Sequence, residues 1–389
     1  MKLTIGIDAT NLRSGGGVTH LVELLRAAHP SRLGVDRVVV WGGTQILAAL
    51  EDRPWLEKRN PPELEHGLPL RVFWQRHRLS KAAYREECDV LFVPGGSYVG
   101  HFHPVVTMSQ SLLPFTVAEL RRYGCTLFTL KLLLLRWTQS RSFRRAEGVV
   151  FLTEYACDAV LNITGKLKGK ARVIPHGVNP RFNHAPRVPC SLNEFSQSHP
   201  FRVLYVSTID LYKHQWHVVE AIAALRGKGL HVVLDLVGPA YSPALNRLNA
   251  TIDRLDARRE WVKYHEILPY ETLHEVYAAA DVGVCASTCE AFGLMLLESM
   301  AAGLPIACSG QRPMQDLVGK AGIYFDPERP DDIARVLYEL MASQELRKKL
   351  AQKSRSRARQ YSWEICADKT FAFLVETARR KKELADVCE

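Results

Sequence analysis

Two glutamates eight residues apart stand out in the stretch CEAFGLMLLESMAAGLPIACS, residues 289–309. Glu290 precedes a Phe292-Gly293 turn, and Glu298 is the only charged residue in the apolar run that follows. A buried carboxylate is costly unless something bonds to it, so Glu298 needs a partner. That partner is either a core ion pair within a buried helix or a ligand.

The same stretch predicts a strand at residues 282–284, a loop, and a helix from about Gly293. Such a layout leaves backbone N–H groups at a helix start, where a diphosphate can bind. Eight helical residues rise about 12 Å at ~1.5 Å each, and a nucleotide-sugar has a similar reach from its hexose to its ribose. The two carboxylates could therefore hold hydroxyls at opposite ends of such a ligand.

The pattern Glu-x7-Glu, followed by SMAAGLPI, resembles the donor-site motif of the retaining GT-B glycosyltransferases of the glycosyltransferase family 4 type. In that family the first Glu lies by the transferred sugar, and the second bonds the ribose. The backbone after the first Glu meets sugar and phosphate. The resemblance therefore implies that Glu290 lies by the transferred sugar and that Glu298 bonds the ribose. It implies contacts with sugar and phosphate for the backbone of Phe292, Gly293 and Leu294.

The elements that must position these residues alternate along most of the chain. Strand-like and helix-like segments follow one another up to about residue 173, and the alternation restarts after residue 200. This predicts an α/β protein with parallel sheets wrapped by helices. The family's hinge segment reads VIPHGV here. The resemblance therefore implies a GT-B fold, with two Rossmann-like domains facing a cleft at the carboxyl ends of their strands.

Three regions follow from that resemblance. Residues 1–174 are expected to form the acceptor-side domain, and residues 175–361 the domain that holds the nucleotide-sugar donor. Residues 362–389 are expected to form a helix that crosses back to the N-terminal domain.

Lys213 follows the first strand of the second domain, in YVSTIDLYKHQ. The family has Gly-Arg after this strand and a Lys five residues later, with both cations on the donor diphosphate. Lys213 matches, but Ser207 and Thr208 stand at the Gly-Arg positions, and a hydroxyl cannot replace a bidentate guanidinium. The resemblance makes Lys213 and Glu290 the catalytic pair, with Thr208 and Gly238 also at the donor. A solvated loop lysine is the alternative for Lys213.

Gly15, Gly16 and Gly17 lead into a predicted helix near Thr19. Glycines there let a ligand approach the backbone, although a plain tight turn explains them too. A dinucleotide site is disfavoured because the spacing is not G-x-G-x-x-G. The family's glycine-rich loop, facing donor phosphate and acceptor, implies a binding role for Gly16 and Gly17.

The family's histidine beside the transferred sugar has no counterpart. Ser109 and Gln110 stand where a His-Asp or His-Asn pair would fall, so that role passes to no residue. No Asp-x-Asp occurs either. The expected enzyme therefore needs no metal, and no cofactor is expected. The resemblance also implies retention of anomeric configuration, with the donor's own diphosphate accepting the proton of the acceptor hydroxyl.

Composition is that of an ordinary globular protein of 389 residues, long enough for two domains. No leader and no apolar run long enough to cross a bilayer is evident. Nine scattered cysteines favour a reduced, cytoplasmic protein. The net charge of +10 attracts anions, but no nucleic-acid motif accompanies it.

A cationic, Leu-rich stretch at residues 121–145 could lie on an anionic membrane surface. The alternative is a helix that buries its leucines in the core. If the first reading holds, the protein is peripheral on the inner face of the membrane.

The predicted function is transfer of a hexose from a nucleotide-diphosphate sugar, with retention, to a glycan or lipid-linked glycan in cell-surface polysaccharide synthesis. Two alternatives stay open. One is a non-catalytic GT-B protein that binds a sugar or a partner. The other is a different GT-B enzyme, such as a nucleotide-sugar epimerase.

Overall fold

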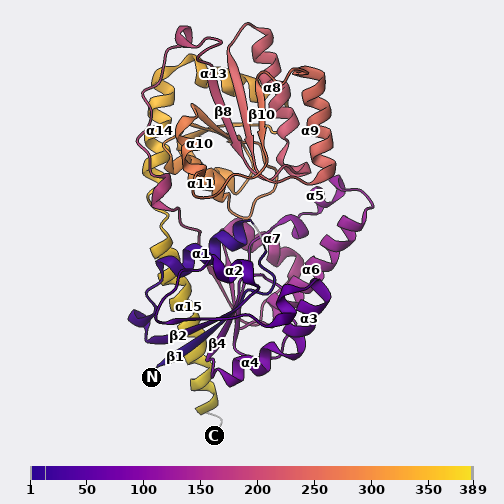
Figure 1. The fold of residues 1–389 in the computed structure, drawn as a ribbon, viewed down its shortest axis with the longest axis vertical. Helices are drawn as coiled ribbons and strands as arrows, with labels where there is room; N and C mark the ends of the chain where they lie inside the picture. The colour runs from indigo at the N-terminus through magenta and orange to yellow at the C-terminus, as the bar shows by residue number, and fades with distance from the viewer. Residues whose placement is uncertain (1, 14, 387–389) are drawn as a thin grey trace. The chain divides into compact units, whose positions relative to one another are not determined.

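The computed structural model describes residues 2–13 and 15–386, and these form two compact units. The first comprises Met1–Leu120, Gly124–Gly177 and Ser362–Glu389, and the second comprises Arg121–Tyr123 and Val178–Tyr361. Each unit is built on its own parallel sheet with helices packed around it (Figure 1). The prediction of two Rossmann-like α/β domains is thus confirmed.

The sheet of the first unit has seven parallel strands in the order β3-β2-β1-β4-β5-β6-β7. Their bounds are β1 Leu3–Asp8, β2 Val35–Trp41, β3 Leu56–Arg59, β4 Val90–Val93, β5 Val105–Ser109, β6 Gly148–Phe151 and β7 Lys170–Val173. β4, β5 and β6 are buried along their whole length, as expected for parallel strands covered on both faces.

Eight helices belong wholly or mostly to this unit. They are α1 Gly16–Ala27, α2 Thr44–Ala48, α3 Leu68–His77, α4 Leu79–Arg85, α5 Val117–Arg122, α6 Leu127–Arg145, α7 Glu154–Thr164 and α15 Trp363–Asp386. α15, the last helix of the chain, packs on α1 and β4 and buries Phe371 and Leu374. It therefore completes the core of the unit that contains the first strands.

The cationic, Leu-rich stretch at residues 121–145 is not a single helix, because the structure divides it between α5 and α6. Gly124 between them has φ +60°, a conformation that glycine adopts without strain. Thr126 then caps α6, its hydroxyl accepting a hydrogen bond from the backbone N–H of Thr129 at 3.3 Å.

α6 does not bury its leucines as a core helix would. Leu127, Leu130 and Leu134 are 86%, 63% and 60% exposed, whereas Leu132 is buried. Trp137 is 59% exposed. None of the helices in the described part of the chain is long and apolar enough to span a bilayer.

The sheet of the second unit has six parallel strands in the order β10-β9-β8-β11-β12-β13. The strands are β8 Phe201–Val206, β9 Val232–Val237, β10 Val262–His265, β11 Val282–Cys285, β12 Ile306–Ser309 and β13 Gly322–Phe325. The helices are α8 Gln215–Gly227, α9 Ser242–Leu255, α10 Leu273–Ala279, α11 Leu294–Ala301, α12 Met314–Val318, α13 Pro330–Ala342 and α14 Gln344–Ala358. Because β9, β8 and β11 are parallel neighbours, the loops after them meet at one edge of the sheet.

Candidate functional site

The loop after β8 brings Lys213 to that edge. It ends in a short 3-10 helix, Leu211–Lys213. The backbone N–H of Leu211 donates a hydrogen bond to the Asp210 carboxylate at 2.7 Å. The Tyr123 hydroxyl donates to the same Asp210 carboxylate at 2.6 Å. Tyr205, on β8, donates to the backbone oxygen of Lys213 at 2.8 Å. The backbone that carries Lys213 is thus held at both ends of the turn.

Lys213 and Glu290 form an ion pair. The lysine is only 8% exposed, and its ammonium donates a short hydrogen bond to the Oε1 of Glu290. Burial alone would lower the pKa of Lys213, but the carboxylate of Glu290 outweighs it and the pKa is raised well above its ordinary value. Lys213 is therefore a cation throughout the physiological pH range, and the structure brings the two predicted catalytic residues together.

The loop after β11 leads into α11 through Phe292 and Gly293. Gly293 has φ +97° and is the N-cap of α11, with no side-chain cap; a residue with a Cβ would be strained there. Phe292 and Leu294 are buried on either side of it. The first N–H groups of α11 lack acceptors within the helix, so this helix start provides the anion-binding geometry predicted from the sequence.

Glu298 lies one turn into α11 and is fully buried. Its Oε1 accepts a hydrogen bond from the Tyr270 hydroxyl at 3.3 Å, and its Oε2 accepts one from Tyr277 at 3.1 Å. Burial and the neighbouring carboxylate raise the pKa of Tyr277 well above its ordinary value. Two phenols thus stabilise this carboxylate, and Tyr270 belongs to the loop between β10 and α10. Each carboxylate oxygen can accept more than one hydrogen bond, so a ligand hydroxyl could share Oε1 with Tyr270.

Gly238 follows β9 and Thr208 follows β8, and the two residues lie beside each other. Gly238 has φ +139°, and a Cβ there would come within 2.3 Å of the carbonyl oxygen of Ser207. Close packing of two loops therefore requires this glycine, whether or not it contacts a ligand. Thr208 is exposed, and its carbonyl oxygen accepts a hydrogen bond from Gln215 at 2.9 Å.

Gly16 and Gly17 begin α1 in the first unit, after the N-cap Gly15 at φ +71°. Space is open around Gly16, while a Cβ on Gly17 would lie 3.4 Å from the side-chain oxygen of Gln110. Gln110, which donates to the Pro94 carbonyl at 3.0 Å, follows β5. Sequence reasoning gave Gln110 no role, although its place after a strand parallel to β1 could have indicated this proximity.

A buried histidine pair in the first unit was also missed. The Nδ1 atoms of His20 and His176 are 3.0 Å apart, and both rings lie against Trp363. Burial lowers the pKa of His20 to about 3 and the pKa of His176 well below its ordinary value. Both rings are therefore neutral, one donating and the other accepting. The two are 156 residues apart in sequence, so no local pattern predicts the contact.

Among the residues with described side chains, no group of three or more His, Cys, Asp or Glu is placed to hold a metal ion. The cation available at the edge of the second sheet is Lys213. What the arrangement can do chemically is to hold an anion beside α11 while presenting one carboxylate, Glu290, next to it.

Two family models match the chain. The model described as Glycosyltransferase Family 4 covers residues 14–182, and the model described as Glycosyl transferases group 1 covers residues 193–357. Together they span both units.

Curated relatives match over shorter stretches. The O-antigen chain mannosyltransferase B of Escherichia coli is 34% identical over 29% of this chain and 30% of its own length. The D-inositol 3-phosphate glycosyltransferase of Corynebacterium jeikeium is 28% identical over 51% of this chain and 49% of its own. The alignments therefore cover less than half of these relatives.

Solved structures match over nearly the whole chain. HepE of Anabaena, in complex with UDP and glucose, has a TM-score of 0.69 at 17% identity, covering 96% of this chain and 100% of that one. Sucrose-phosphate synthase of Thermosynechococcus elongatus has a TM-score of 0.73 at 17% identity, covering 99% and 100%. At such identities the likeness concerns the fold, and it agrees with the predicted GT-B architecture.

Proposed function

The chain belongs to the GT-B glycosyltransferases of the glycosyltransferase family 4 type, and from this premise we propose that it is a retaining, metal-independent hexosyltransferase. The donor is a nucleotide-diphosphate sugar, and the acceptor is a hydroxyl of a glycan or lipid-linked glycan in cell-surface polysaccharide synthesis. The observation that carries the proposal is the buried Lys213–Glu290 ion pair beside the uncapped start of α11. The mannosyltransferase among its relatives and the UDP bound by HepE support the substrate class.

In this proposal the departing diphosphate binds to Lys213 and to the backbone N–H groups of Phe292, Gly293 and Leu294. The bond between the anomeric carbon and the phosphate oxygen breaks, and a bond to the acceptor oxygen forms on the same face. The proton of the acceptor hydroxyl passes to the diphosphate. No side-chain nucleophile is needed, so the protein contributes positioning and stabilisation of charge on the leaving group.

The two carboxylates orient the donor. Glu290 bonds a hydroxyl of the hexose, and Glu298 bonds the ribose. Because Thr208 offers no guanidinium, Lys213 is the main cation on the diphosphate. We place Gly16 and Gly17 at the phosphate and acceptor, as the family's glycine-rich loop suggests.

A panel of UDP- and GDP-linked hexoses tests the activity. We expect the wild-type protein to release UDP or GDP from one of them, slowly by hydrolysis and faster with an acceptor glycan, and the anomeric configuration of the product is read by NMR. A non-catalytic binding protein would bind a nucleotide-sugar without releasing the nucleotide. An epimerase would convert the sugar without adding it to an acceptor.

We further propose that the enzyme works at the inner, cytoplasmic face of a membrane, attached through α6. The exposed residues Leu127, Leu130, Leu134 and Trp137 recur at helical spacing and so share one face. Lys131 lies among them and is itself exposed. Apolar side chains beside cations are the composition of a helix that lies in an anionic bilayer surface.

α3 adds a second exposed apolar group to the same unit. Its members, each more than a third exposed, are Leu68, Leu70, Val72 and Phe73. Both helices are tied to Ser97, which bonds Gln75 of α3 through its carbonyl and Thr138 of α6 through its hydroxyl. The exposed apolar side chains of α3 support the proposal that this unit has an interaction surface.

Liposome flotation tests the attachment. We expect binding to anionic vesicles at low salt, weakened by high salt and lost in the variant Leu130→Ser/Leu134→Ser/Trp137→Ser. The control Ile163→Ser/Ile365→Ser removes two other exposed apolar side chains of the first unit and should still bind. No flotation of the wild-type protein with anionic lipid would leave a soluble acceptor as the substrate.

A further inference from the structure

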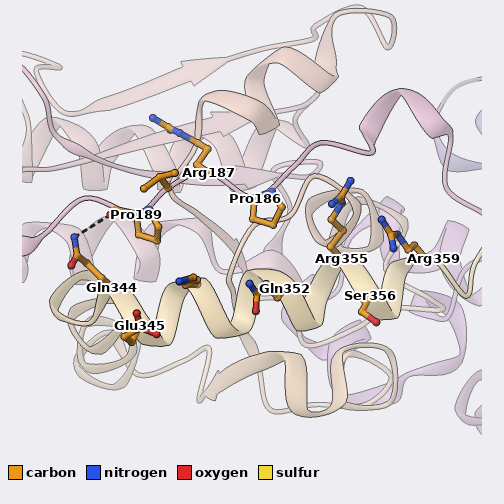
Figure 2. Close-up of a pocket in the computed structure, with 11 residues that line it drawn as sticks. Pro186, Arg187, Pro189, Gln344, Glu345, Gln352, Arg355, Ser356 and Arg359 are labelled. Atoms are coloured by element: carbon orange, nitrogen blue, oxygen red, sulfur yellow. Dashed lines mark hydrogen bonds between the residues drawn. The ribbon is translucent and has the colours of Figure 1, made fainter.

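A groove with a volume of about 620 Å³ runs along α14 in the second unit (Figure 2). One wall is the extended segment that contains Pro186, Arg187, Val188 and Pro189. The other is a single face of the helix and its C-cap, formed by Gln344, Glu345, Lys348, Gln352, Arg355, Ser356 and Arg359. The groove shares no residue with the site at the ends of β8 and β11.

Four cationic side chains line the groove, and two of them, Arg355 and Arg359, lie at one end. Arg355 and Arg359 rise one turn apart from the last part of the helix, on the side of Pro186 (Figure 2). Within the described part of the chain neither forms an ion pair, and the Nε of Arg355 is buried without a hydrogen-bond acceptor. A guanidinium group without a carboxylate partner can bind an anionic ligand, and its fork geometry matches phosphate oxygens.

Ordinary helix stabilisation does not account for this end of the groove. A cation in the last turn of a helix gains about 0.3–1 kcal/mol from the helix dipole, which explains a basic residue there. It does not explain why two guanidinium groups without an ion pair among the described residues line one end of a groove. Arg187, by contrast, is satisfied by the carbonyl of Ala279 at 2.8 Å and by Asp281 at 3.4 Å.

The other end of the groove differs in chemistry. Gln344 and Glu345 lie there, with Gln352 between the two ends (Figure 2). Gln344 is fixed by donating to the Pro189 carbonyl at 3.0 Å. Amide and carboxylate groups suit hydroxyls, and Lys348, three residues from Glu345, also lines this part of the groove.

We propose that this groove is a binding site for a small monophosphorylated polyol, such as a sugar phosphate. The phosphate binds between Arg355 and Arg359, because the guanidinium fork matches phosphate oxygens. The hydroxyls of the ligand face Gln352 and Glu345, and Pro186 and Val188 cover an apolar face of its ring. A volume of this size is common for small-molecule sites, which span about 300–1,000 Å³. This site is independent of the proposed transferase function.

The probes are glucose 6-phosphate, inorganic phosphate and glucose, titrated calorimetrically into a Lys213→Ala variant so that phosphate at the proposed donor site does not contribute. We expect saturable one-to-one binding of glucose 6-phosphate, weaker binding of phosphate, and none of glucose. Arg355→Gln/Arg359→Gln should weaken glucose 6-phosphate binding at least tenfold. The control Lys349→Gln/Lys353→Gln removes the same charge from exposed positions of α14 outside the groove and should retain binding.

An equal loss in both variants would reduce the effect to general attraction by a basic helix and overturn the proposal, as would no binding by the wild-type protein. If Lys213→Ala does not fold, hydrogen–deuterium exchange on the wild-type protein replaces calorimetry. Glucose 6-phosphate should then protect residues 186–189 and 344–359, and protection elsewhere alone would refute the site. Nucleotide release by Arg355→Gln/Arg359→Gln should equal that of the wild type, so failure of the groove and failure of the transferase proposal are told apart.

Discussion

Replacement of Lys213 by Gln tests the centre of the proposed mechanism. This lysine bonds Glu290, so the substitution affects stability as well as catalysis. A hydrogen bond to a charged group contributes about 1.5–3 kcal/mol, and we expect the single variants Lys213→Gln and Glu290→Gln each to lose stability in that range. Loss of one preorganised donor to a leaving group costs about 3–4 kcal/mol in the transition state, so Lys213→Gln should lower turnover a hundredfold or more.

The double variant Lys213→Gln/Glu290→Gln separates the two effects. Two facing amides can bond each other, so the double variant should recover part of the free energy of unfolding lost by each single variant. Its turnover should stay as low as that of Lys213→Gln, because no cation has returned. Urea unfolding and nucleotide release, measured on all four proteins, provide the comparison.

Thr208→Arg in the Lys213→Gln background extends the test. Thr208 is exposed, so the longer side chain can be accommodated, and a guanidinium there should restore part of the lost turnover. A fully active Lys213→Gln variant, or activity that returns with stability in the double variant, would refute the placement of the phosphate site. If Thr208→Arg leaves turnover unchanged in this background, the loop that carries it lies away from the donor.

Three further predictions concern ribose binding, metals and pH. Glu298→Gln should weaken donor binding about tenfold or more, since a charge-assisted bond of about 1.5–3 kcal/mol is lost, whereas Tyr270→Phe should not weaken it. If Glu298→Gln unfolds while the protein that stays folded binds the donor with unchanged affinity, the role of the carboxylate is structural. Activity should persist in excess EDTA because Lys213 supplies the charge on the diphosphate, and loss on chelation with recovery on adding magnesium or manganese would count against this. Because the pKa values of His20 and His176 are lowered on folding, the unfolded chain binds more protons below pH 6.5. Stability should therefore fall as pH drops below 6.5, and the pair should contribute about 4 kcal/mol of that loss at pH 5. Between pH 7 and pH 5 the variant His20→Gln should lose about 2 kcal/mol less than the wild-type protein in urea unfolding.

The parts of the fold that could be predicted are those with strong local patterns. The buried strands β8, β9 and β11 read as apolar runs, and the start of α11 follows from Gly293. Residues 44–85 carry no comparable periodicity, and their short elements β3, α3 and α4 were not predicted. The break at Gly124 was hidden because cationic and apolar residues continue on both sides of it, and only the positive φ ends the helix.

Exposure on α6 shows a second limit of sequence reasoning. Leucines in LFTLKLLLLRW fall on several sides of the helix, so their spacing does not decide which of them meet the core. Only the packing of neighbouring elements shows that Leu132 is buried while Leu130 and Leu134 are not. The assignment of the two domains to acceptor and donor stays a prediction.

Contacts between distant residues set a third limit at the candidate site. The sequence indicated Lys213 and Glu290 separately, one for phosphate and one for sugar, but the two are 77 residues apart and their bond to each other could not be read from either motif. The hydrogen bond that the Tyr270 hydroxyl donates to Glu298 could not be predicted from the motif either. Both additions are contacts between residues of this chain, which motifs that describe contacts with a ligand do not predict.

The ion pair changes how the proposed donor site should respond to partial ligands. With no ligand, Glu290 neutralises a buried cation that would otherwise be costly. A diphosphate that takes Lys213 from Glu290 leaves that carboxylate without its partner, unless a sugar hydroxyl is present to donate to it. Under the proposed function, a complete nucleotide-sugar satisfies both groups at once, whereas a nucleoside diphosphate satisfies only the lysine. The affinity difference between the two ligands should therefore shrink in Glu290→Gln, since the amide no longer needs a donor to offset the loss of the ammonium, and an unchanged difference would show that the two residues act independently.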